Sequence, residues 1–125
     1  MKIAVIGSRG LEVPNLEKYL PVETTEIVSG GARGVDFSAR KCAVELGLKL
    51  TEFLPEYSKY GKIAPIKRNI QIIEHSDTVF AFWDGVSKGT KHVIDNCKVR
   101  NIPLRIFMKK TVTQEAKGST ESDDC

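Results

Sequence analysis

Five short apolar runs, rich in β-branched and aromatic residues, divide the chain and predict five strands. The fourth run is almost continuously apolar, which is typical of a strand that is buried on both faces. In the last run Arg105 alternates with apolar neighbours, as expected at the edge of a sheet. The predicted strands are residues 2–6, 24–29, 48–54, 77–83 and 103–108.

Helical spacing of apolar residues predicts a helix in each interval between these strands. The pattern is clearest in the helix that runs to Leu46, where Gly47 provides the stop. It is imperfect over residues 11–20, where Pro14 suits only a first turn.

The third interval combines a loop with a helix. Residues 57–62 are rich in aromatic residues and lysine and are expected to form the loop. The helix is then expected to begin at Pro65, with Ile66, Ile70 and Ile73 along one face. Its first turn would carry two polar residues within reach of a ligand.

The last helix is predicted from about residue 88 to 100, with Asn101 as its cap. Strands that alternate with helices of this length form a parallel sheet with right-handed crossovers. We therefore predict a single α/β, Rossmann-like three-layer domain over residues 1–108, with five parallel strands in the order 3-2-1-4-5. In such a sheet ligands bind where the strand order reverses, here between strands 1 and 4. The polar residues 109–125 are expected to form a disordered tail.

Composition changes this picture only slightly. The formal net charge of +3 is too small to indicate nucleic-acid binding by itself, and no apolar run reaches the roughly 20 residues of a membrane span. We expect a cytoplasmic protein without membrane contact. Cys42 and Cys97 lie on apolar helical stripes and Cys125 ends the tail, so reduced thiols and no metal site are expected. His75 and His92 lack an evident partner and are interpreted as structural or surface residues.

Three glycine-bearing loops follow predicted strands 1, 2 and 4, at residues 7–10, 29–36 and 84–90. The carboxyl ends of parallel strands meet at one edge, so these loops are expected to converge on one pocket. Glycines allow close approach of the backbone, and free N–H groups at a helix start favour a phosphate. The predicted ligand-binding residues are Gly7, Ser8, Arg9, Ser29, Gly30, Gly31, Arg33, Gly34, Asp36, Arg68, Asn69, Trp83, Gly85, Ser87, Gly89 and Thr90.

Each of these residues also has a plainer interpretation. The glycines could serve only tight turns, and Arg9 and Arg33 could be solvated surface charges. Asp36 in a first helical turn is stabilised by the helix dipole, whether or not it also accepts a ribose hydroxyl. Trp83 is either a core residue or a platform for a base.

In chain order, residues 2–9 (KIAVIGSR), 30–36 (GGARGVD) and 60–69 (YGKIAPIKRN), followed by Gly85 and Gly89-Thr90, resemble the SLOG superfamily. That group joins the DNA-processing Smf/DprA proteins to the LOG-type nucleotide hydrolases. The chain is most similar to its small YspA-like members, described as DUF2493 proteins. The resemblance implies a Rossmann-like fold that binds a nucleotide or nucleotide-derived ligand, with a homodimer completing the pocket. The pocket residues it implies are Ser8, Arg9, Gly30, Gly31, Arg33, Gly34, Asp36, Arg68, Asn69, Gly89 and Thr90.

One departure from the family pattern bears on catalysis. LOG-type hydrolases carry P-G-G-x-G-T-x-x-E, whose glutamate assists cleavage of an N-glycosidic bond together with an arginine on the preceding helix. Here Gly89-Thr90 and Arg68 match, but the glutamate position is Val93, which cannot exchange a proton. The candidate catalytic residues are therefore Arg68, with Asp36 or Asp84 in place of the glutamate.

Three hypotheses for the function follow, and the first is favoured. It is the binding or sensing of a nucleotide or nucleotide-derived phosphate ligand, with no further cofactor indicated. The second is hydrolysis of the N-glycosidic bond of nucleoside monophosphates. The third is binding of single-stranded nucleic acid, as the resemblance to DprA suggests. The residues for that role are Arg9, Arg33, Arg68, Lys62 and Lys67 on phosphates, with Trp83 or Tyr60 stacking on bases.

Overall fold

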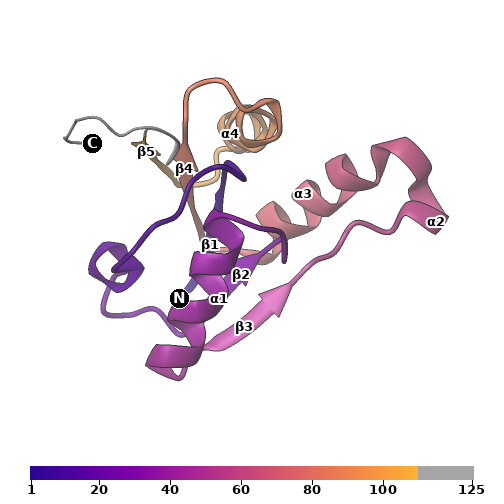
Figure 1. Ribbon diagram of the computed structural model, residues 1–125. Coiled ribbons are helices and arrows are strands. Elements are labelled where there is room, and N and C mark those ends of the chain that lie inside the picture. The colour runs from indigo at the N-terminus through magenta and orange to yellow at the C-terminus, as the bar shows by residue number, and fades with distance from the viewer. Residues whose placement is uncertain (110–125) are drawn as a thin grey trace.

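The computed structural model describes residues 1–109, which form an α/β fold around a five-stranded parallel sheet (Figure 1). The strands lie in the order β3-β2-β1-β4-β5, and every neighbouring pair is parallel. The predicted Rossmann-like architecture and strand order are thus confirmed. The strands are β1 (Lys2–Gly7), β2 (Glu26–Ser29), β3 (Lys49–Glu52), β4 (Thr78–Trp83) and β5 (Leu104–Met108).

Helices cover both faces of the sheet, with α1 on one face and α3 and α4 on the other (Figure 1). Gly47 and Asn101 adopt left-handed conformations after α1 and α4, so both predicted helix ends are confirmed. The helices are η1 (Leu16–Tyr19), α1 (Val35–Leu46), α2 (Tyr57–Tyr60), η2 (Gly61–Ile63), α3 (Ala64–His75) and α4 (Lys88–Arg100). Among residues 1–109, no helix has the length and apolar character that crossing a bilayer requires.

The helix predicted over residues 11–20 is wrong, because only the short 3-10 helix η1 forms there. Pro14 lacks an N–H group, and Asn15 adopts a left-handed φ of 57°, so an α-helix cannot run through this segment. Its buried side chains are Leu11, Val13 and Leu16, which pack on the sheet from a mostly irregular chain.

The connection from β3 to β4 also differs from the prediction. Residues 57–62, expected as a loop, form α2 and the start of η2. On α3 the buried residues include Ile72 and Ile73, whereas the predicted face residue Ile66 is 46% exposed. The first half of α3 extends beyond the sheet, and the helix contributes Ile72 and Ile73, from its second half, to the core (Figure 1).

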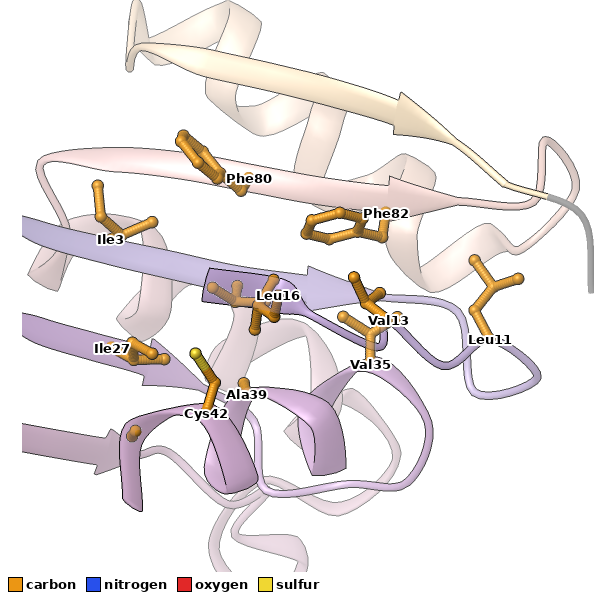
Figure 2. Packing of buried hydrophobic residues seen from close by; sticks show 12 residues of the cluster. Ile3, Leu11, Val13, Leu16, Ile27, Val35, Ala39, Cys42, Phe80 and Phe82 are labelled. Atoms are coloured by element: carbon orange, nitrogen blue, oxygen red, sulfur yellow. The ribbon is translucent and has the colours of Figure 1, made fainter. Parts of the chain in front are cut away.

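The core consists of two clusters, one on each face of the sheet, because side chains alternate along the strands. Ile3 points to the α1 face, where it packs with Phe80 and Phe82 (Figure 2). Cys42 belongs to this cluster and Cys97 to the other. Both are free thiols, and burial raises the pKa of each to about 11.

His75 does have a partner, contrary to the sequence-based interpretation. Its Nε2 lies 2.9 Å from Oε2 of Glu26, which also accepts a hydrogen bond of 2.6 Å from the Thr51 hydroxyl. Burial by itself raises the pKa of Glu26, but these hydrogen bonds and the charge of Lys49 lower it below the ordinary value. His92 likewise lies 3.1 Å from the Asn96 amide nitrogen. The predicted tail, apart from Lys109, falls outside the described residues.

Candidate functional site

A cleft of about 470 Å³ opens at the carboxyl ends of β1, β2 and β4, between the first halves of α3 and α4. This is the point where the strand order reverses, so the cleft lies where a doubly wound sheet places its ligands. The structure brings together the predicted residues Gly7, Ser8, Arg9, Gly30, Asp36, Arg68, Asn69, Ser87, Gly89 and Thr90. The predicted residues that do not line the cleft are Ser29, Gly31, Arg33, Gly34, Trp83 and Gly85.

Ser8 joins the loop after β1 to the loop after β4. Its backbone N–H donates a hydrogen bond of 3.1 Å to the carbonyl of Phe82, and its hydroxyl accepts one of 3.3 Å from the Asp84 N–H. The Ser8 residue is only 2% exposed. These contacts hold the two loops in register on either side of the cleft.

Asp36, in the first turn of α1, brings a buried carboxylate to the β2 side of the cleft. It is 7% exposed, and its Oδ2 accepts a hydrogen bond of 3.1 Å from the Ala32 N–H. Burial raises the pKa of Asp36 above its ordinary value, although the Ala32 N–H and the charge of Arg68 oppose the rise. The carboxyl is thus held closer to its protonated form than an exposed aspartate.

Arg68 extends from α3 to the same wall. Its Nη1 donates a hydrogen bond of 2.9 Å to the Gly30 carbonyl, and its Nε donates one of 3.0 Å to Asn69 Oδ1. A Cβ atom at Gly30 would lie 2.5 Å from Arg68 Nη1 and 3.0 Å from Asp36 Oδ2, so a side chain here would displace the Arg68 guanidinium from the wall. Burial lowers the pKa of Arg68, and the nearby charge of Asp36 opposes this effect.

Asp84 shapes the opposite wall because its side chain accepts hydrogen bonds from the backbone of the turn that follows it. Its Oδ1 accepts hydrogen bonds of 2.9 Å from the Val86 N–H and 2.8 Å from the Ser87 N–H. Burial alone raises the pKa of Asp84, but these bonds and the Ser8 hydroxyl lower it below the ordinary value. The turn presents Ser87 as the N-cap residue of α4.

The first turn of α4 is open to the cleft. Within residues 1–109, no side chain caps this helix start, and a Cβ atom at Gly89 would meet nothing within 4 Å apart from its chain neighbours and the backbone of α4 itself. Thr90 is 4% exposed, and its hydroxyl lies 3.3 Å from that of Ser87. Free N–H groups and two hydroxyls therefore face the cleft where the helix dipole is positive.

Trp83 does not line the cleft. Its indole Nε1 donates a hydrogen bond of 3.0 Å to the Ser87 carbonyl, which holds the ring against the loop after β4. Its position beside the apolar cluster under α4 corresponds to the plainer interpretation of this residue.

The cleft also has an apolar wall, of which the sequence predicted only Val93, at the position of the family's glutamate. Ile6, Ile72 and Val93 line it, and all three are buried. Apolar residues of a strand end or a helix give no sequence signal that separates a pocket wall from the core. The remaining lining residues are Gly10, Ala32, Pro65 and the candidate Asp84.

Comparisons of the chain with protein-family models, curated proteins and solved structures find no match. The chemistry of the cleft is therefore read from its own residues. It combines donors for an anion, a buried carboxylate with a raised pKa, and an apolar surface.

Proposed function

We propose that this cleft binds a nucleotide or a nucleotide-derived ligand through a phosphate group. The observation that carries the proposal is the convergence of the uncapped first turn of α4 with Arg9 and Arg68 on one cleft. Helix N-termini and guanidinium groups are the protein donors best suited to phosphate oxygens. The hydroxyls of Ser87 and Thr90 add further donors beside them.

The rest of the cleft suits the rest of a nucleotide. Its volume of about 470 Å³ falls in the range of small-molecule sites. A base would pack against the wall formed by Ile6, Ile72 and Val93, and the Asp36 carboxylate would accept a hydrogen bond from a ribose hydroxyl. The resemblance to the SLOG superfamily supports the same proposal, because parts of its glycine motifs lie on two walls of this cleft.

Binding is tested by isothermal titration with AMP, followed by a thermal-shift panel of ADP, ADP-ribose, NAD and deoxynucleotides. AMP should raise the unfolding temperature by mass action. Arg9→Gln should weaken AMP binding by about tenfold, the equivalent of one charge-assisted hydrogen bond. Arg9 is exposed, so this change should leave the fold intact.

Lys98→Gln is the matched control, because it removes a positive charge from an exposed position near the far end of α4. It should bind AMP as the unmodified chain does. Absence of any stabilisation by the whole panel at millimolar concentration would contradict the proposal.

A second candidate is hydrolysis of the N-glycosidic bond of a nucleoside monophosphate, and Asp36 is the observation that favours it. A buried carboxyl whose pKa is raised can donate a proton to a departing base. Asp84 is unsuited to this role, because two backbone N–H groups hold its carboxylate in the charged form. Val93 lines the cleft but has no proton to offer.

Hydrolysis is tested by chromatography of the free base released from a panel of nucleoside monophosphates. Asp36→Asn should reduce the rate at least about a hundredfold, the usual contribution of a general acid. Asp84→Asn should leave most of it. A rate that survives in Asp36→Asn would remove the proposed proton donor, and no release from any substrate would leave binding as the function.

Single-stranded nucleic acid is less well supported, because both proposed stacking residues already have contacts within the protein. Trp83 is held by its hydrogen bond to Ser87. The ammonium groups of Lys59 and Lys67 lie 5.2 Å and 5.6 Å from the centre of the Tyr60 ring. A base would have to displace these cations in order to stack.

A further inference from the structure

A second hollow of about 430 Å³ adjoins the cleft, and the two share Arg9 and Gly10. The other residues that line the second hollow are Glu12, Arg33 and Gly34. Arg33 was expected in the same pocket as the other loop residues. The structure instead places it beyond Arg9, at the beginning of α1.

Close packing between two loops creates this hollow. Gly34 has a left-handed φ of +69°, and a Cβ atom there would lie 2.4 Å from the Arg9 carbonyl oxygen. Beside this contact, Leu11 and Val13 of the loop after β1 lie next to Val35 at the start of α1 (Figure 2). The backbone contact therefore fixes the bases of the Arg9 and Arg33 side chains beside one hollow.

The charges around the hollow are unbalanced. Within residues 1–109, the side chains of Arg9 and Arg33 make no hydrogen bond or ion pair, and two guanidinium groups face one carboxylate, that of Glu12. Burial is the main cause that lowers the pKa of Arg68, and the charge of Arg9, which lines both hollows, adds a smaller effect in the same direction, so these two guanidinium groups repel each other weakly. An anion that spans both hollows would relieve this repulsion.

We propose that the ligand carries a diphosphate, with one phosphate in the cleft and the next beside Arg9 and Arg33. The ligand class is then a nucleoside diphosphate or a diphosphate-linked nucleotide rather than a nucleoside monophosphate. This inference rests on the proposed function, because the cleft must first hold a nucleotide. The shared Arg9 faces both hollows, and its planar fork of donors suits two adjacent phosphates.

The test is the ratio of the dissociation constants of AMP and ADP, measured by isothermal titration at one fixed salt concentration. The unmodified chain should bind ADP about tenfold more tightly than AMP, since the second phosphate gains a charge-assisted contact. Arg33→Gln should bring this ratio close to one. Glu12→Gln should raise it, because it removes the carboxylate that faces the second phosphate.

Lys98→Gln, which removes a charge far from both hollows, should keep the ratio of the unmodified chain. Thermal unfolding without ligand verifies that each variant folds, as expected for exposed side chains. Equal affinities for AMP and ADP, or the same ratio in Arg33→Gln and Lys98→Gln, would overturn the diphosphate inference while leaving AMP binding intact. Failure of both nucleotides to bind would overturn the proposed function itself.

Discussion

Asp36 and Asp84 lie on either side of β1 and line the same cleft, yet the fold shifts their pKa values in opposite directions. The carboxylate of Asp84 accepts two short backbone hydrogen bonds from its own turn. The carboxylate of Asp36 is buried, and the Ala32 and Gly30 N–H groups do not offset the effect of that burial on its pKa. Burial therefore outweighs the hydrogen bonds at Asp36, whereas the hydrogen bonds outweigh burial at Asp84, and this balance decides which form of each carboxyl is favoured.

The two walls consequently suit different tasks. The Asp84 carboxylate accepts hydrogen bonds from the Val86 and Ser87 N–H groups just before α4 begins. It does not cap the helix, so the first N–H groups of α4 remain for a ligand. On the other wall, Asp36 and Arg68 remain as side-chain groups that can contact a ligand directly. A glycine at the start of each of the two helices shows a similar contrast, since Gly34, the N-cap residue of α1, is enclosed by backbone while Gly89 in the first turn of α4 faces open space.

The largest expected effect contrasts these two glycines. Gly34→Ala should destabilise the fold by about 3 kcal/mol, because of its left-handed φ of +69° and the Arg9 carbonyl 2.4 Å from the new Cβ. Gly89→Ala should stabilise it by about 0.5 kcal/mol, since alanine restricts the unfolded chain and meets no neighbour. Urea unfolding measures both free energies.

In Gly89→Ala, the affinity for AMP should change in the opposite direction to the stability of the fold. Gly89 lines the cleft, so the added methyl group of Gly89→Ala should make this more stable protein bind AMP less tightly. A stability loss in Gly89→Ala equal to that in Gly34→Ala would show that the starts of α1 and α4 do not differ in packing.

The sheet could be predicted because its signals are local. Each strand is an apolar run with a turn behind it, and the order of the strands follows from the helices between them. Residues 11–20 misled the prediction because Leu16, Tyr19 and Leu20 fit helical spacing, although Pro14 and Asn15 prevent an α-helix. The leucines of this segment are buried against the sheet, although the chain that carries them is mostly irregular.

The cleft was predictable only where backbone position decides it. Loops at strand ends had to converge, and Ser8, Asp36 and Thr90 do line or adjoin one space. The direction of a side chain within a loop cannot be predicted in this way. The sequence therefore did not show that Arg33 lines the second hollow or that Trp83 donates a hydrogen bond to the Ser87 carbonyl.

A smaller effect, in the pH dependence of stability, tests the two aspartates directly. The folded-state pKa of Asp84 lies below its ordinary value of 3.8, so its contribution is present above 3.8 and is lost as the pH falls through the folded value. The folded-state pKa of Asp36 lies above 3.8, so its contribution is present below 3.8 and is lost as the pH rises through the folded value.

Replacing each aspartate by asparagine should therefore change the free energy of unfolding with opposite pH slopes. From acid to neutral pH, Asp84→Asn should become more destabilising relative to the unmodified chain, and Asp36→Asn less so. Urea unfolding at one pH on each side of 3.8 measures the two slopes, and slopes of the same sign would mean that the two carboxylates share one environment.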